Sequence, residues 1–453
     1  MPVTIPSTSG QTSGLSRRQF LRLSATAAGA LALAACAAPV APAAPTTAGG
    51  EAPSVLRGAN INFLGGSWFV PALVDAFQAF TTDWATQNNV NFTLDVVTQD
   101  LNTKLAAAIE TRQGANLAQI DFSPSSIRNA LVDISDIAQE LIDGQGEFTS
   151  ATRYNCTVDG NWFALPYGEH PRMINYREDW FTEIGYDSFP DTWEEVLKAG
   201  KVLKEAGRPY GWTLSEQSPA DGPAACLVLL WAFGGKEFNP DGSVALDSQE
   251  TIDALNFAIE LYNDACDPAS TSYQEATNNQ AFLAGQISMT YNVNTIYLPA
   301  KDNNPELAEV MNHALPPQGP GGAHNYTGVA SMILLDHTEG IDRDAARAFM
   351  KDFYTAENYA KFIKEGQGYL IASQPVYDDM DVWPADPKLA ATREAGKIGR
   401  VSGYELPGPN ELASLVQTQV VIPKMFSLAV SSGDARAALD AAMAEIAELE
   451  AQV

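Results

Sequence analysis

The chain is poor in basic residues. Of its 453 residues, 27 are Lys or Arg and 55 are Asp or Glu, which gives a formal net charge of −28. A protein this acidic repels the phosphate backbone of nucleic acids, so we expect no nucleic-acid partner. The net charge does not fix the sign of a small ligand, because one pocket can differ from the field of the whole surface.

Histidine is also rare, and the usual catalytic and cofactor motifs are missing. The 4 histidines are scattered and lack zinc-site spacing. There is no Gly-x-Ser-x-Gly, no Gly-x-x-x-x-Gly-Lys-Ser/Thr, and no Gly-x-Gly-x-x-Gly after a strand. The stretch 239–250 has side-chain oxygens at EF-hand spacing, but Gly242 stands too early in it and 244–246 predicts a hairpin strand. We expect no metal, no cofactor and no enzymatic activity.

The apolar run near the start, 23–35, is too short to span a bilayer, which takes roughly 20 residues. Arg17 and Arg18 precede this run, as in a twin-arginine export signal, and Leu33-Ala34-Ala35-Cys36 has small residues before a cysteine, as at a lipoprotein cleavage site. We expect 1–35 to be this signal, Cys36 to carry the lipid, and the Ala- and Pro-rich 36–56 to be a disordered tether. The protein would then work outside the cytoplasm, anchored to the outer face of the cell membrane or in the periplasm.

Only three further cysteines remain, namely Cys156, Cys226 and Cys266. An odd number cannot pair completely within one chain, and the spacing selects no pair. The alternative is that all three are buried as small apolar side chains.

The segments that remain predict two domains, because roughly 400 ordered residues exceed what one hydrophobic core supports. Strands expected at 60–64, 92–97 and 118–122 alternate with helices expected at 71–85 and 101–112, a pattern typical of βαβ units and a parallel sheet. Farther along we expect strands at 287–291 and 328–335, and helices at 191–206, 223–233, 248–263, 278–283, 341–355, 357–365 and 433–449.

Five segments, in order, resemble motifs of the extracellular solute-binding proteins of ABC importers, family 1, a group of sugar-binding lipoproteins similar to maltose-binding protein. They are GNWFALPY at 160–167, MINYREDWF at 173–181, FPDTWEEV at 189–196, AFLAGQISM at 281–289, and AARAFM at 345–350 followed by Thr355-Ala356-Glu357. The third strand, 118–122, departs from the family, which often has Pro-Asp-Val there.

The resemblance implies an α/β, two-lobed periplasmic-binding-protein-like fold of type II, with three interlobe crossings. We expect these crossings near 165–168, 289–294 and 326–329. Lobe one would comprise 57–165 plus 292–327, and lobe two 168–289 plus 328–450. The ligand would lie in the cleft between them, since open parallel sheets bind ligands beyond the carboxyl ends of their strands.

Candidate ligand-binding residues follow the expected strands, the crossings and the end of one apolar helix. They are Gly66, Ser67, Trp68, Ser123, Ser125, Tyr167, Glu169, Trp231, Gly235, Tyr291, Asn292, Tyr326, Gln367 and Tyr369. Each has a structural alternative: a plain turn for the glycines and serines, core packing for Trp68 and Trp231, and a hinge salt bridge between Glu169 and Arg172. Rings that stack, with amides and carboxylates that bind hydroxyl groups, suit an uncharged polyhydroxylated ligand.

The resemblance thus implies the substrate-binding component of an ABC importer, a monomer that captures a sugar, either an oligosaccharide or a glycoside, and delivers it to the membrane permease. The main alternative is an exported glycan-active enzyme using a carboxylate pair, for which the acids at 378–381 would have to face a cleft. A surface-anchored adhesion protein or receptor-coupled sensor is a third hypothesis.

Overall fold

The computed structural model describes residues 55–97 and 100–453. The expected export signal, Cys36 and nearly all of the expected tether lie outside the described residues. The strands are β1 (Asn60–Gly66), β2 (Asn91–Val97), β3 (Leu117–Ile120), β4 (Thr157–Val158), β5 (Asn161–Trp162), β6 (Ala164–Pro171), β7 (Met173–Arg177), β8 (Met289–Asn292), β9 (Met311–Ala314), β10 (Asn325–Leu334) and β11 (Gly399–Arg400).

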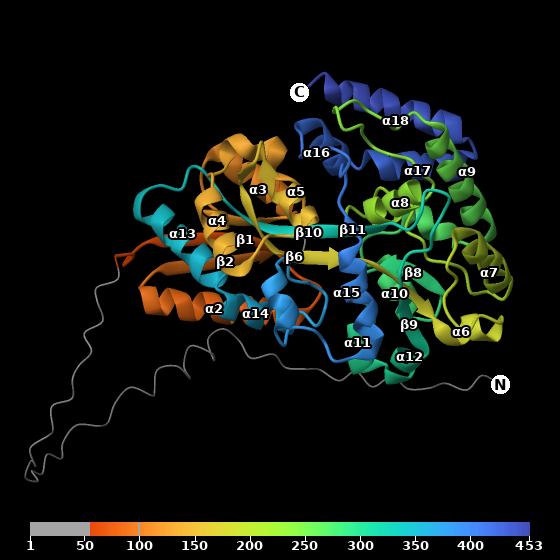
Figure 1. The fold of residues 1–453 in the computed structure, drawn as a ribbon, viewed down its shortest axis with the longest axis horizontal. Coiled ribbons are helices and arrows are strands. Elements are labelled where there is room, and N and C mark those ends of the chain that lie inside the picture. Colours follow the sequence, from red (N-terminus) through yellow and green to blue (C-terminus); the bar gives the residue numbers. More distant parts are fainter. Residues whose placement is uncertain (1–54, 98–99) are drawn as a thin grey trace, which may run out of the picture. The chain divides into compact units, whose positions relative to one another are not determined.

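The helices lie between and after these strands (Figure 1). The α-helices are α2 (Pro71–Asn88), α3 (Leu101–Thr111), α4 (Ser135–Gln145), α5 (Ser150–Cys156), α6 (Glu178–Glu183), α7 (Trp193–Glu205), α8 (Asp221–Ala232), α9 (Gln249–Asp264), α10 (Thr277–Leu283), α11 (Tyr297–Asn303), α12 (Pro305–Val310), α13 (Gly340–Phe353), α14 (Ala356–Glu365), α15 (Ala390–Lys397), α16 (Glu411–Thr418), α17 (Val421–Ser432) and α18 (Ala435–Glu450). Short 3₁₀ helices are η1 (Pro124–Ala130), η2 (Pro268–Ser272), η3 (Pro375–Asp379) and η4 (Pro387–Leu389).

The larger sheet has the strand order β11-β10-β3-β1-β2, and β6 also pairs with β10. The pairs β1–β2 and β1–β3 are parallel, whereas β10 runs antiparallel to both β3 and β6. All four residues of β3 are buried, because this strand lies between β1 and β10. The carboxyl ends of β1 and β3 therefore meet at one edge of the sheet.

The helix α2 shows how the sequence pattern forms this part of the fold. Pro71 opens the helix, where its missing N–H is not needed. Leu73, Phe77 and Trp84 form a stripe that is buried against the sheet and against α14, which lies beside α2 (Figure 1). We call the cluster that contains these residues, the larger sheet, α13 and α14 the first core.

A second core forms around helices that are far apart in the sequence. α8 and α9 pack with α17 and α18, which come almost 200 residues later in the chain (Figure 1). α8 is buried on every side, as its almost wholly apolar sequence requires. Next to this core stands a sheet of order β8-β7-β9, in which both outer strands run antiparallel to β7.

The predicted elements in both parts are confirmed to within a few residues, including the strands β1, β2, β3 and β8 and the helices α2, α3, α7, α13, α14 and α18. Two long strands, β6 and β7, and the helices α16 and α17 were not predicted. β6 contains Pro166, Gly168 and Pro171, which is a turn-like composition. It is held as a strand by its pairing with β10, which has an irregularity between Ala330 and Ser331.

The packing agrees with the boundaries expected for the two lobes only in part. Ile296, Leu298 and Leu307, in the segment assigned to lobe one, do belong to the first core. β9, inside the 292–327 segment assigned to lobe one, pairs with β7 in the smaller sheet. β10, α13 and α14, inside the 328–450 segment assigned to lobe two, belong to the larger sheet and the first core. The chain leaves the larger sheet at Arg172, between β6 and β7, and returns to it between β9 and β10. These segments are reassigned to the other lobe because of the strands with which they pair. The order of motifs along the chain does not show which strands pair.

The cysteines, the 239–250 stretch and the apolar helices bear on three further expectations. Cys156, Cys226 and Cys266 are all free and buried. The 239–250 stretch begins with a hairpin, closed by the Phe238–Val244 bridge, and no group of metal-ligating side chains occurs in 55–97 or 100–453. Within those ranges no single helix is both long and apolar enough to cross a membrane, although α16 and α17 meet the criterion as a pair bent by 46°.

Candidate functional site

A pocket of about 200 Å³ lies where the carboxyl ends of β1 and β3 face residues of the second core. The first core contributes Gly66, Ser67 and Trp68 after β1, and Asp121 just after β3. The opposite wall includes Asp221 at the start of α8, Glu275 and Asn279 from α10 and the loop before it, Asn292 at the end of β8, and Gln417 from α16. The pocket is smaller than the 300–1,000 Å³ common for ligand sites.

Aromatic rings form much of the wall, and two of them, Trp68 and Tyr326, are packed against further rings behind them. Trp68 meets Tyr167 edge-on at 5.5 Å between ring centroids, and also contacts Phe77 and Phe362. Tyr326 is stacked on Trp231 at 6.2 Å with an interplanar angle of 15°. Such packing fixes the faces that the rings present to a ligand.

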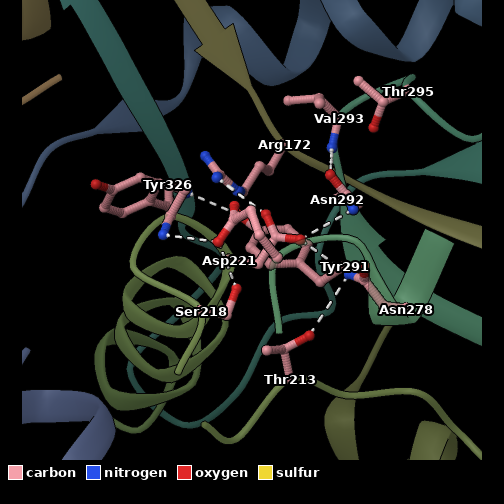
Figure 2. Close-up of polar contacts among 12 residues, drawn as sticks. Arg172, Thr213, Ser218, Asp221, Asn278, Tyr291, Asn292, Val293, Thr295 and Tyr326 are labelled. Carbon is pink, nitrogen blue, oxygen red and sulfur yellow. Dashed lines mark hydrogen bonds and ion pairs between the residues drawn. The ribbon is translucent and has the colours of Figure 1, made fainter. Parts of the chain in front are cut away.

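Arg172 and Asp221 form the centre of a buried polar network (Figure 2). The guanidinium of Arg172 donates to Asp221 Oδ1 over 3.1 Å and lies over the Tyr326 ring, 5.3 Å from its centroid. Asp221 Oδ2 accepts from the amides of Asn278 (2.9 Å) and Asn292 (3.0 Å). The charge of Asp221 is therefore fully partnered, as a buried charge must be.

Two other carboxylates at the pocket have no cationic partner among the described residues. Asp121 is exposed toward the pocket and accepts a weak hydrogen bond, 3.3 Å long, from Gln119. Burial by the surrounding walls raises the pKa of Asp121, which the Gln119 bond and the Arg172 charge only partly oppose. Glu275 Oε2 accepts from Ser218 Oγ and from the Ala220 N–H, while burial and the Asp221 charge raise its pKa to about 7.

His170 completes the set of titratable groups. Burial and the neighbouring Arg172 charge lower the pKa of His170 to about 3, so its imidazole is neutral at physiological pH. Its ring contacts Tyr369 edge-on at 4.7 Å. Arg172 is thus the single positive charge among the lining residues that the structure describes, against three carboxylates.

A larger open groove, of about 1130 Å³, lies elsewhere on this part of the chain. It is lined by α5, by the hairpin at 240–242 and by the segment 397–410. None of the residues that follow β1 or β3 reaches it. Because ligands of α/β sheets bind at those strand ends, the smaller pocket is the better candidate.

The chain was compared with known proteins. The model of the family described as bacterial extracellular solute-binding protein matches residues 72–391. The chain belongs to this family. The family is one of extracellular proteins, which agrees with the expected location outside the cytoplasm.

Curated relatives of this solute-binding protein are distant. A probable ABC transporter-binding protein of Deinococcus radiodurans is 23% identical over 316 residues, which cover 67% of this chain and 74% of the relative. An arabinooligosaccharide-binding protein of Halalkalibacterium halodurans is 24% identical over 259 residues, covering 53% of this chain and 55% of the relative.

Solved structures agree in fold. A sugar transporter from Arthrobacter chlorophenolicus with bound laminaribiose has a TM-score of 0.72 at 19% identity, covering 86% of this chain and 99% of that structure. Maltose-bound MalE3 of T. maritima has a TM-score of 0.68 at 20% identity, covering 87% and 100%. The expected fold, α/β of the type II periplasmic-binding-protein class, is confirmed.

Of the residues expected to bind ligand, six line the pocket of this solute-binding protein. They are Gly66, Ser67, Trp68, Asn292, Tyr326 and Tyr369. They come from the ends of β1 and β8, from the start of β10 and from the loop after α14. The first three support the expectation that ligands meet the end of the first strand.

Three others lie directly behind the lining. Tyr167 is fully buried against Trp68 and Phe63, and Trp231 is buried behind Tyr326. Tyr291 donates its hydroxyl hydrogen to Asn325 Oδ1 over 2.6 Å and accepts from the Tyr326 N–H. These residues position the wall and do not form it.

The remaining five are occupied elsewhere. Ser123 and Ser125 are buried against α16, where Ser125 Oγ donates to the Asn410 carbonyl. Glu169 accepts from the Thr149 and Thr152 hydroxyls and does not line the pocket, and Arg172 pairs with Asp221 in place of the alternative salt bridge with Glu169.

Gly235 closes the end of α8, because its N–H donates to the Leu230 carbonyl and an added Cβ would lie 2.3 Å from the Leu230 side chain. The carbonyl of Gln367 accepts from the Asn294 side chain, while the Gln367 side chain itself is exposed and lies outside the pocket.

The charged lining residues were missed. Asp121 follows the third strand, where the sequence departs from the family motif, and Arg172 lies between two of the resembling motifs, near an expected crossing. Both signals were visible in the sequence. Asp221 and Glu275 gave no such signal, because they reach the pocket from an apolar helix and a surface loop through the fold alone.

Proposed function

We propose that this protein captures a sugar, either an oligosaccharide or a glycoside, in the pocket between the two cores and delivers it to the permease of an ABC importer. The observation that carries the proposal is the pocket itself. Buried rings of Trp68, Tyr326 and Tyr369 offer apolar faces for sugar C–H groups, and carboxylates and amides beside them accept or donate hydrogen bonds to hydroxyl groups. The relatives and solved structures above, several named for sugars, support the same ligand class.

The mechanism we infer is capture by closure of two lobes. One lobe would comprise the first core with the larger sheet, and the other the second core with the smaller sheet. The chain passes between the sheets at Arg172, next to the pocket, so a small backbone rotation there would change the width of the pocket. A sugar that contacts both walls favours the closed form, which is the form that the permease would recognise.

The finer statements about location also stay proposals. We infer that the twin-arginine signal directs export, that Cys36 is lipidated, and that the protein acts as a monomer tethered to the membrane. Metabolic labelling with a radioactive fatty acid tests the anchor: the wild type takes up label and Cys36→Ser does not. Label in both proteins would contradict the role of Cys36.

A thermal-shift panel tests the proposed ligand class. Mono-, di- and trisaccharides are compared with amino acids, dicarboxylates and divalent metals. Sugars are expected to raise the melting temperature, because a ligand that binds only the folded state stabilises it. Trp68→Ala should remove the shift, whereas Phe233→Ala, on an aromatic residue outside the pocket, should not. A shift given by amino acids or metals, with none from sugars, would overturn the proposal.

The alternative of a glycan-active enzyme is separated by a second measurement. Asp121, Asp221 and Glu275 are carboxylates at one pocket, which is the chemistry such an enzyme uses. Asp221 is held by Arg172 and two amides, which suits a structural role better than proton transfer. Turnover of a chromogenic glycoside, abolished by Asp121→Asn or Glu275→Gln, would favour the enzyme.

A further inference from the structure

The side chains that line the pocket carry more negative than positive charge. Three carboxylates, Asp121, Asp221 and Glu275, stand against the single cation Arg172. Arg172 forms a buried ion pair with Asp221, because the two side chains are 3.1 Å apart and only 7% and 5% exposed. Its charge is therefore already balanced. Asp121 and Glu275 are left without an ion-pair partner in the part of the chain that the structure describes.

The hydrogen bonds made by these two acids leave room for a ligand. Among the described residues, Asp121 accepts hydrogen bonds only from the Gln119 amide, at 3.3 and 3.5 Å. Glu275 accepts hydrogen bonds from Ser218 and Ala220 through Oε2, which leaves Oε1 for another donor. A carboxylate that lines a pocket is stabilised most by a charged donor, because ionic hydrogen bonds are roughly twice as strong as neutral ones.

The pocket also contains polar atoms that lack partners inside the protein. Trp68 Nε1 and Arg172 Nε are buried N–H donors with no acceptor among the described residues. Both side chains line the pocket. A ligand that supplies hydroxyl oxygens to these donors and a positive group to the acids would satisfy both sets.

We propose that the ligand is a sugar bearing a protonated amine, with the ammonium group held by Asp121 and Glu275 and the ring faces against the aromatic wall. This inference rests on the proposed sugar-binding function and narrows its ligand class. It differs from the uncharged ligand expected from the sequence, because Asp121 and Glu275 were not among the residues considered there.

Matched sugar pairs test the proposal by isothermal titration calorimetry. Glucosamine, galactosamine and the β-1,4 disaccharide of glucosamine are each compared with glucose, galactose and cellobiose, which carry a hydroxyl in place of each amine. At least one amine-bearing sugar should bind ten-fold or more tightly than its neutral counterpart, and added NaCl should reduce the difference.

Variants assign the preference to the two acids. Asp121→Asn and Glu275→Gln keep side-chain shape and should each reduce amine-sugar binding by about ten-fold while changing neutral-sugar binding less than three-fold. Asp379→Asn, on an exposed acid outside the pocket, is the control and should change neither. Circular dichroism melts of all three variants verify folding.

The possible results distinguish failure of the amine preference from failure of sugar binding itself. Neutral sugars that bind as tightly as their amine-bearing counterparts would overturn the amine inference and leave sugar binding intact. An amine preference that survives both acid variants would overturn the assignment to Asp121 and Glu275. If no sugar of either kind binds, the sugar-binding function itself fails, and this inference fails with it.

Discussion

At the scale of single residues, the pocket depends on charges whose partners are fixed. Arg172 lies in the chain between β6 of the larger sheet and β7 of the smaller sheet. Its side chain pairs with Asp221 and faces the Tyr326 ring. Removing one member of a buried ion pair leaves the other charge without compensation, which is usually far worse than lacking the pair altogether. Arg172 therefore stabilises the folded chain where it passes between the sheets, and it fixes the positions of Asp221 and Tyr326 in the pocket wall.

Arg172→Met should lower the free energy of unfolding by about 3–5 kcal/mol, because it leaves Asp221 buried and unpaired. Urea denaturation measures the change. The double variant Arg172→Met with Asp221→Asn removes the orphaned charge and should recover at least half of the loss. A single variant within about 1 kcal/mol of the wild type would show that solvent reaches Asp221.

A second buried acid lies apart from the pocket. Glu237 is 2% exposed and accepts from Ser402 Oγ (2.6 Å) and the Gly403 N–H (2.9 Å). Burial, together with repulsion from Glu405, raises the pKa of Glu237 to about 8 from an ordinary value of 4.5. Between these pH values the folded protein keeps a proton that the unfolded chain releases, so stability falls as the pH rises through this window and levels off above about 8.

Glu237→Gln should remove this loss, because its amide can accept from Gly403 and donate to Ser402 without a charge. At pH 8 we expect the variant to be more stable than the wild type by roughly 2–4 kcal/mol, since one pKa unit corresponds to about 1.4 kcal/mol, and the difference should shrink toward pH 4.5. Thermal melts from pH 4.5 to 9 measure it. Glu216→Gln, on an exposed acid, is the control. Equal stability at pH 8 would contradict the assignment.

At the scale of elements, η1 and α16 form a contact between the two cores. Ser414 Oγ of α16 donates to Ser126 Oγ (3.0 Å) and lies 3.3 Å from the Ser123 carbonyl oxygen, and Ser125 donates to the Asn410 carbonyl just before α16. Leu412 and Val416 of α16 belong to the second core, whereas Ile127 of η1 packs on the first. Gln417 from the same helix lines the pocket, so this contact couples pocket width to the relative position of the cores.

Ser414→Ala should weaken sugar binding by about five-fold without changing the stability of the ligand-free protein. The reason is that the contact would exist only in the closed form, where a hydrogen bond contributes about 1 kcal/mol. Titration calorimetry and ligand-free melts measure the two quantities. Ser431→Ala, which removes an exposed hydrogen bond on α17, is the matched control. A loss of ligand-free stability with an unchanged Kd would indicate that the contact persists without ligand.

Sequence patterns predicted individual helices and strands better than any other feature of the structure. The Leu73-Phe77-Trp84 stripe of α2 is visible as helical periodicity, and so the helix was predicted correctly. β6 was not, because Pro166 and Gly168 read locally as a turn and only pairing with β10 makes them a strand. The site divides in the same way: residues adjacent to strand ends, such as Trp68, were predicted, whereas Glu275 reaches the pocket through long-range packing.

At the scale of the whole protein, the two cores have separate hydrophobic interiors. The pocket lies between them, so a change in the relative position of the two cores would change its width. This arrangement permits the binding energy of a ligand that contacts both walls to be used for closure.

Small-angle X-ray scattering should detect this closure. Saturating sugar is expected to reduce the radius of gyration of the wild type, because the cores move together around the ligand. Trp68→Ala, which should not bind, is expected to keep the ligand-free value. A radius of gyration that is unchanged in the wild type at saturating sugar would contradict a hinged mechanism.

The central claim is that the pocket between the cores binds a sugar and does not cleave or modify it. Native mass spectrometry of the protein incubated with a mixture of neutral and amine-bearing oligosaccharides tests it most directly. We predict one bound sugar per chain, released at its original mass. An absence of any adduct, or recovery of shorter cleaved sugars, would contradict the claim.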